Sequence, residues 1–146
     1  SEREDKEPES LYIILTHEVI HLAVDKISKG RCPYWLDEGL AVYCSQELSD
    51  EYLAKLQEAV KSDRILPLEI LGNPLHIDTS EEVRQLAYSE VSSITEYFIE
   101  TYGWDKVKSI VIQIAKRHIK NILSDLSLNY YLLEQGWKRW LRSKSA

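Results

Sequence analysis

Two histidines and a glutamate near the amino end of the chain have the spacing of a metal site. His17 and His21 are four residues apart, so in a helix both imidazoles point from one face and can bind the same ion. Glu18 lies about 100° round that helix from His17, which lets its carboxylate reach a water molecule instead of the metal. The H-E-x-x-H pattern therefore predicts two ligands, His17 and His21, and a general base, Glu18.

A third ligand is available in residues 35–41, which read W-L-D-E-G-L-A. A catalytic zinc site usually has three protein ligands and one open position, and two histidines with one glutamate form a recurring set. Glu38 completes that set and predicts Zn²⁺ as the bound ion. In the same segment, Trp35 is expected to anchor its helix in the core, and Gly39 to let the two ligand-bearing helices approach closely.

The alternative interpretation of the two histidines is a core pair that bonds to backbone groups or to Asp25. Their helix is apolar on nearly every side, which predicts that it is buried in the protein interior. Three titratable groups within five residues are costly to bury without a metal or a partner, so the metal site is favoured. The apolar positions are Leu11, Ile13, Ile14, Leu15, Val19, Ile20, Leu22, Ala23 and Val24.

Residues 17–21 followed by residues 33–43 resemble the gluzincin branch of zinc metallopeptidases, in the peptidase MA-like group. In the thermolysin-like and aminopeptidase families of that group, a W-L-x-E-G-x-A helix supplies the third ligand. Looser similarity continues through residues 86–89, 97–107 and 137–141. The resemblance implies a mainly α, zincin-like metallopeptidase domain over residues 9–146, which hydrolyses peptide bonds with a metal-activated water.

The chain departs from this family pattern around the ligands. Thermolysin-like enzymes place an aspartate four residues after the glutamate ligand to orient a histidine, but Val42 stands there. Asp25, one turn after His21, could instead accept a hydrogen bond from the free ring nitrogen of that histidine. The alternative is that Asp25 is an ordinary acid on the helix surface.

The segment before the predicted zinc helix is short and polar. The resembled families have an antiparallel β-sheet there, and its edge strand binds the substrate by strand addition. Residues 1–8 are mostly charged and predict a flexible polar arm. We therefore expect the sheet to be absent or minimal in this chain. The sequence also lacks methionine, and we expect it to be a fragment or truncated form of a longer protein.

The composition is that of a globular domain. The 146 residues are 44% hydrophobic and 29% charged, which is ordinary for such a domain. A net charge of -6 and the lack of a basic stripe argue against nucleic acid as a partner. No apolar run is long enough to span a membrane. The two cysteines, Cys32 and Cys44, are expected to be free thiols.

Hydrophobic periodicity predicts an almost entirely helical chain. The predicted helices cover about residues 9–29, 35–47, 51–62, 80–102, 104–117, 119–126 and 128–144. Gly30 and Gly103 end two of them, and Thr79 or Ser80 caps the start of the fourth. Residues 65–78 predict a loop with one short helical turn, because they contain prolines and a Gly72-Asn73-Pro74 turn.

An oxyanion donor is the last component that the resemblance implies. Gluzincins commonly use a tyrosine or a histidine beside the zinc, and such donors contribute on the order of 10²-fold or more in rate. Tyr88 is our candidate because it points away from the apolar stripe of its helix. A partly exposed tyrosine without a catalytic part is the alternative interpretation of Tyr88, and His76 is the alternative donor.

The sequence thus predicts zinc-dependent hydrolysis of a peptide or protein substrate, with Glu18 as the general base. One alternative is a zinc-binding regulatory or interaction module without peptidase activity. Another is a helical interaction domain in which the motif is accidental. Zinc content separates this last alternative from the other two.

Overall fold

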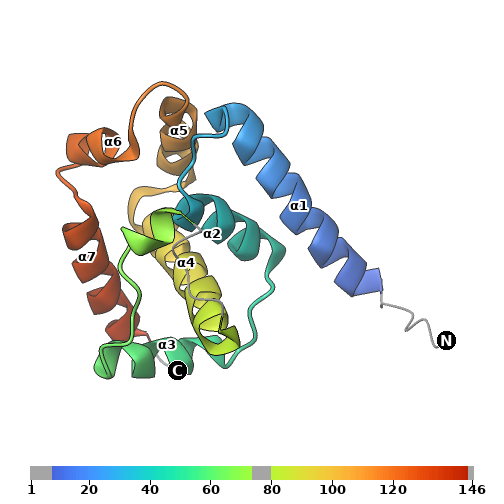
Figure 1. Cartoon of the computed structure of the whole chain (residues 1–146), viewed down its shortest axis with the longest axis vertical. Helices are drawn as coiled ribbons and strands as arrows, with labels where there is room; N and C mark the ends of the chain where they lie inside the picture. The colour runs from blue at the N-terminus through green and yellow to red at the C-terminus, as the bar shows by residue number, and fades with distance from the viewer. Residues whose placement is uncertain (1–7, 74–79, 145–146) are drawn as a thin grey trace.

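A computed structural model describes residues 8–73 and 80–144, with side chains from residue 10 onward. The described residues form helices and no strand, which confirms the predicted mainly α fold. The seven α-helices and one short 3-10 helix of the described part (Figure 1) are α1 (Pro8–Ser28), α2 (Tyr34–Ser45), α3 (Tyr52–Lys61), η1 (Ile70–Gly72), α4 (Glu81–Tyr102), α5 (Trp104–Ile114), α6 (Ile119–Asp125) and α7 (Tyr130–Ser143).

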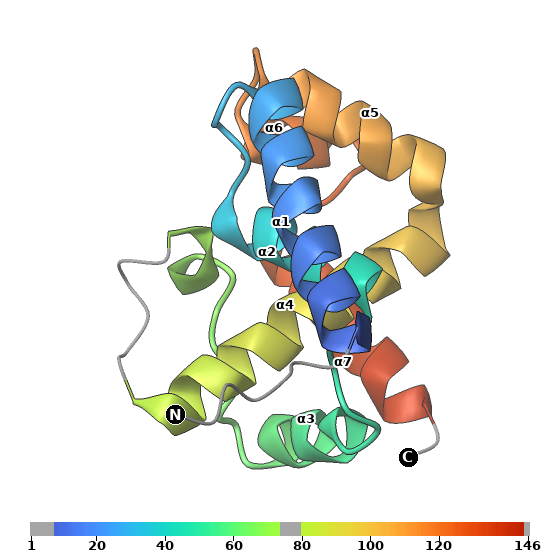
Figure 2. The ribbon, with the colours of Figure 1, turned by 90° about the vertical axis from the view of Figure 1, so that its right-hand side faces the viewer.

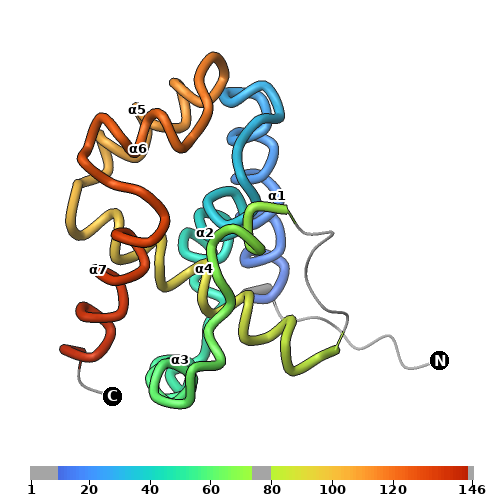
Figure 3. Tube along the Cα trace, turned by 60° about the vertical axis from the view of Figure 1, so that its left-hand side comes forward, coloured from blue at the N-terminus to red at the C-terminus, as the bar shows by residue number. Residues whose placement is uncertain are grey.

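The helices α2 and α4 pack against each other in the middle of the molecule. On one side α1 packs on α2 and on α5, and it forms the surface nearest the viewer in Figure 2. On the other side α7 contacts α3 and α4, and α5 contacts α6 at the far end of the molecule (Figure 3). The helix α2, which carries the predicted ligand Glu38, therefore lies between α1 and α4.

Local signals in the sequence set several helix ends. Gly30 follows α1 with a φ of 71°, and its N–H donates to the backbone C=O of Asp25 over 2.8 Å. The Ser80 side chain accepts from the N–H of Val83 at the start of α4, and Gly103 follows that helix with a φ of 85°. These ends confirm the predicted caps, because glycine adopts positive φ without strain.

The helix α2 ends at Ser45 and not near residue 47 as predicted. Gln46 adopts a left-handed conformation with a φ of 56°, and its N–H donates to the C=O of Tyr43. The chain therefore leaves the helix axis two residues before the predicted end, which takes Glu47 out of the helix. Similarly, α5 ends at Ile114 and not near residue 117. The 3-10 helix η1 is the short turn predicted within residues 65–78, of which 74–78 lie outside the described residues.

The core is densest where α2 crosses α4. Trp35 is 1% exposed, as its predicted anchoring role requires. A Cβ added to Gly39 would lie 2.1 Å from Thr95 Oγ1 and 2.5 Å from the backbone O of Val91. Gly39 therefore permits the close approach of α2 and α4. The prediction that it lets the two helices with the candidate ligands approach closely is wrong, because the atoms nearest its added Cβ belong to α4 and not to α1.

The prediction that α1 is buried is also wrong for most of its length. Among its described side chains only Val24 and Ser28 are buried. The helix contacts α2 and α5 along one side, and the opposite side lies at the surface. Seven large apolar side chains on α1 are between 43% and 70% exposed: Leu11, Tyr12, Ile14, Leu15, Val19, Leu22 and Ile27.

Among the helices of the described part, none has the length and apolar character that crossing a membrane requires. Cys32 and Cys44 are free thiols, as predicted.

Candidate metal centre

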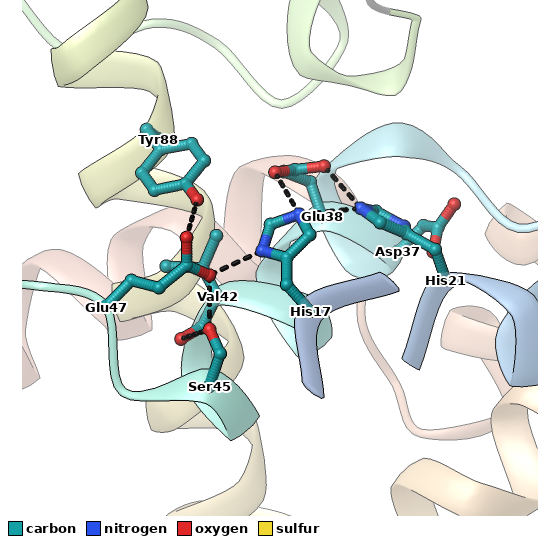
Figure 4. Close-up of polar contacts among 8 residues, drawn as sticks. All are labelled: His17, His21, Asp37, Glu38, Val42, Ser45, Glu47 and Tyr88. Atoms are coloured by element: carbon teal, nitrogen blue, oxygen red, sulfur yellow. Dashed lines mark hydrogen bonds and ion pairs between the residues drawn. The ribbon is translucent and has the colours of Figure 1, made fainter. Parts of the chain in front are cut away.

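Two helices bring the three predicted ligands together. His17 and His21 point from α1 toward Glu38 on α2 (Figure 4). The two Nε2 atoms are 3.0 Å apart, and the Glu38 carboxylate oxygens lie 3.3 Å from Nε2 of His17 and 2.9 Å from Nε2 of His21. Two ligand atoms at about 2.0–2.1 Å from a tetrahedral zinc ion are about 3.3 Å apart. The observed spacing is close to that geometry.

Carboxylates hold the outer ring nitrogen of each histidine. Nδ1 of His21 donates to Oδ1 of Asp37 over 2.9 Å, and Nδ1 of His17 donates to the Glu47 carboxylate. An ionised carboxylate can only accept, so in the neutral rings the proton lies on Nδ1 and Nε2 keeps a lone pair. Two lone pairs and the Glu38 carboxylate then converge on one point, which suits a bound cation. The donor set therefore fits a divalent metal.

Asp37, and not the predicted Asp25, is the hydrogen-bond partner of His21. Asp25 is exposed on α1, whereas Nδ1 of His21 faces α2. Asp37 directly precedes Glu38 in that helix, so both carboxylates reach the same imidazole. An acid next to the third ligand was the sequence signal that could have identified this contact.

Glu47 is a site residue that the sequence did not reveal. Its carboxylate accepts from Ser45 Oγ, from Nδ1 of His17 and, over 2.5 Å, from Tyr88 Oη (Figure 4). Burial raises the pKa of Glu47, but these hydrogen bonds outweigh burial and lower it below its ordinary value. The carboxylate therefore stays ionised and orients His17, although Val42 occupies the position of the family aspartate. No periodic pattern marks a residue that lies beyond a helix end.

The electrostatic balance at the ligands favours a bound cation. Burial lowers the pKa of His21, but the hydrogen bond and charge of Asp37, with the charges of Glu38 and Glu18, outweigh burial and raise it. For Glu38, burial raises the pKa and the charges of Asp37 and Glu47 add to that rise. The electrostatic interaction with His17 and His21 opposes it. Four carboxylates thus act on two imidazoles, an excess of negative charge that a divalent ion compensates.

Glu18, the predicted base, lies beside the ligands and open to solvent. It follows His17 directly in α1, and its charge is near enough to His21 to contribute to the raised pKa of that histidine. Its side chain is exposed, on the same surface as the apolar residues Val19 and Leu22. An exposed carboxylate next to the ligands is accessible to both water and substrate.

Tyr88 also lies at the centre, but its hydroxyl is already engaged. Its ring is parallel to the His17 imidazole, with 6.3 Å between centroids and 9° between planes. The hydroxyl donates to Glu47 over 2.5 Å. Burial and this hydrogen bond raise the pKa of Tyr88, so it stays a donor. The alternative donor, His76, lies outside the described residues.

An H-E-x-x-H helix with a glutamate from the next helix is typical of the metallopeptidase class. The family model of the Peptidase MA superfamily matches residues 12–143, so the chain belongs to this superfamily. The match confirms the resemblance drawn from the motifs and extends it over nearly the whole chain. Comparisons with curated proteins and with solved structures give no significant match.

Proposed function

We propose that this protein is a zinc-dependent peptidase whose metal is held by His17, His21 and Glu38. The convergence of two Nε2 atoms and one carboxylate, with both Nδ1 atoms committed to carboxylates, is the observation that supports it best. Membership of the Peptidase MA superfamily supports a peptide or protein as the substrate. When bound, Zn²⁺ supplies a Lewis acid that polarises the peptide carbonyl and lowers the pKa of water.

Glu18 is the proposed general base. Its carboxylate takes the proton from the attacking water and later delivers that proton to the departing amine. Asp37 and Glu47 keep the two imidazoles in the orientation and tautomer that binding requires. Their hydrogen bonds to Nδ1 support this part of the proposal.

Tyr88 is the proposed donor to the oxyanion. Its protonated hydroxyl and its position beside His17 support that role. Because the hydroxyl donates to Glu47, it must exchange this partner for the substrate oxygen. Replacing Tyr88 with phenylalanine tests the role directly. If Tyr88 is the oxyanion donor, the variant should lose about 10²-fold or more in kcat with zinc content unchanged. If Tyr88 only holds the Glu47 carboxylate in place, the variant should bind zinc more weakly instead.

Elemental analysis of the purified chain by mass spectrometry is the primary test. We expect about one zinc per chain in the wild type and in Glu18→Gln, and its loss in His17→Ala and in Glu38→Ala. We expect the wild type to hydrolyse a mixed peptide library and Glu18→Gln to leave it intact. A wild-type chain without metal after incubation with zinc would overturn the proposal, and turnover by Glu18→Gln would refute the mechanism.

A zinc-binding regulatory or interaction module is the second candidate function. The exposed apolar side of α1 favours it, because this surface lies beside Glu18 and resembles a contact surface. Chelation distinguishes the two candidates. If the metal is catalytic, chelation stops turnover and leaves the helices folded; if it is structural, chelation melts them, as circular dichroism would record.

A further inference from the structure

A large groove opens next to the metal centre. It has a volume of about 1250 Å³ and runs between α3 and the first half of α4. The segment after α2 borders it at one end, where Glu47 and Tyr88 are part of its wall. We call it the α3–α4 groove. Pockets that bind small molecules in proteins have volumes of roughly 300–1,000 Å³, so the groove has room for one or two amino-acid side chains.

The groove borders the metal centre at two side chains. Glu47 and Tyr88 line it, and both also contact His17. The ring centroids of Tyr88 and His17 are 6.3 Å apart, whereas an extended peptide advances about 3.3 Å per residue. A peptide that extends from the metal centre past His17 therefore covers the distance to the Tyr88 ring in about two residues.

The floor of the groove is apolar. Leu56 and Ala59 from α3 are buried there, with exposed fractions of 0% and 1%. Leu66 and Leu86 are half-buried and complete this surface. An apolar side chain that covers the accessible parts of Leu66 and Leu86 removes water from both surfaces, which is favourable, whereas a charged side chain loses its hydration there.

Each of the three basic side chains on the rim of the groove lies close to a carboxylate. Arg84 Nη2 lies 2.7 Å from the Glu81 carboxylate, and Arg64 Nη1 lies 3.8 Å from that of Glu82. On the opposite wall, Nζ of Lys55 lies 4.0 Å from the carboxylate of Glu51, one helical turn earlier. With Glu47 and Glu58, the groove is lined by four carboxylates and three basic groups. This small excess of negative charge gives the rim little with which to select an acidic or a basic side chain.

We propose that the α3–α4 groove is a specificity pocket that takes an apolar side chain of the peptide substrate, within about two residues of the scissile bond. The inference rests on the proposed peptidase function, because that function makes a peptide the molecule held beside His17. The groove then selects Leu-like and Phe-like residues over Asp, Lys or Gly at this position of the substrate.

Peptide binding to the zinc-loaded Glu18→Gln chain tests this inference without consuming the substrate. The probes are blocked glycine peptides with one variable residue, Leu, Phe, Asp, Lys or Gly, placed successively at each position. Calorimetry measures their affinities. Burial of one large apolar side chain predicts that Leu or Phe at one position binds about tenfold or more tighter than Gly. Asp and Lys are expected to bind no tighter than Gly.

Two substitutions from opposite walls link the preference to the groove. Ala54 and Gln85 are exposed residues that line it, and tryptophan at either site fills its mouth. Ala54→Trp and Gln85→Trp are each expected to reduce Leu and Phe affinity to the level of Gly. The control is Lys61→Trp, on the same helix as Ala54 but away from the groove, which is expected to keep the preference. Circular dichroism confirms that all three variants fold.

The outcomes separate this inference from the proposed function. Equal affinity for all probes, or a preference that survives both tryptophan substitutions, overturns the groove as a specificity pocket even if the wild-type chain cleaves peptides. An apolar preference that both substitutions abolish supports the groove. If the wild-type chain cleaves none of the preferred peptides in that case, the peptidase proposal fails while the binding site stands.

Discussion

The two helices that carry the candidate metal ligands, α1 and α2, are held in very different ways. α2 lies between α1 and α4, and its buried residues extend from Trp35 to Ser45. α1 contacts its neighbours along one side and exposes seven large apolar side chains on the other. The core therefore fixes the position of Glu38. The positions of the two histidines depend more on single side-chain contacts, which are the hydrogen bonds of their rings to Asp37 and Glu47.

This difference shows what an apolar sequence does and does not imply. Both helices are rich in hydrophobic residues, but only α2 has a described neighbour on each side. Apolar residues show that a surface gains from being covered. They do not show that residues of the same chain cover it. Substitutions on α1 and on α2 should therefore differ in their effects in solution.

The largest expected contrast is between two leucine-to-alanine substitutions. Leu36 on α2 is 2% exposed and Leu22 on α1 is 70% exposed. Leu36→Ala leaves a cavity in the core and should lower the free energy of unfolding by about 2–5 kcal/mol. Leu22→Ala removes an exposed side chain and should change it by less than about 0.5 kcal/mol. Urea denaturation measures both, and equal losses would mean that the outer side of α1 is covered in solution.

Gly39 allows a test of how closely α2 packs on α4. In an exposed helix, replacing glycine with alanine stabilises by about 1 kcal/mol. At Gly39 the new methyl group would lie 2.5 Å from the backbone O of Val91, so Gly39→Ala should instead destabilise by about 1–3 kcal/mol. Gly72→Ala is the control, because no atom lies within 4 Å of its added Cβ. Thermal unfolding that showed no loss for Gly39→Ala would contradict the close contact of the two helices.

The weaker attachment of the α1 ligands predicts sensitivity to Glu47. Glu47→Ala removes the acceptor for Nδ1 of His17 and should weaken zinc binding by about 10–100-fold. Glu47→Gln retains one acceptor oxygen, so its loss should be smaller. The control is Glu51→Ala, which removes an exposed acid four residues along the chain. Competition with a zinc chelator measures the affinities, and an unchanged affinity for Glu47→Ala would show that α1 orients His17 unaided.

The packed side of the molecule also differs from the α1 surface in its acidic residues. Glu18 is exposed, whereas Glu90 on α4 is 0% exposed, with one oxygen accepting from the N–H of Leu66. Burial raises the pKa of Glu90 well above the ordinary 4.5. Between 4.5 and the raised pKa, the folded state keeps the proton and the unfolded state releases it, so stability falls as pH rises.

The Glu90→Gln variant should remove that dependence. Relative to this variant, the wild type is expected to lose stability as pH rises from 4.5, by at most about 1.4 kcal/mol per pH unit. Denaturation curves across the range from pH 4 to about pH 8 measure the difference. If the free energy of unfolding varied with pH in the same way for both proteins, Glu90 would ionise in the folded state at its ordinary pKa.

The helices and the ligand set could be predicted from the sequence because both follow from local rules. Helical spacing places His17 and His21 on one face, and Gly30, Ser80 and Gly103 mark helix ends through their own backbone preferences. Glu38 could be recognised because its W-L-D-E-G-L-A segment resembles a known motif. All three candidate ligands converge in the structure, with ligand atoms within 4.8 Å of one another.

By itself, the sequence determined which residues could form helices and which side chains could bind a metal, since these properties belong to short stretches of chain. Only the tertiary structure decided which acids hold the histidines, which helix Gly39 faces and which side of α1 is exposed. Asp37, Glu47 and Thr95 acquire their roles through contacts between distant segments. Such contacts depend on how the helices pack, which residue spacing within one helix does not specify.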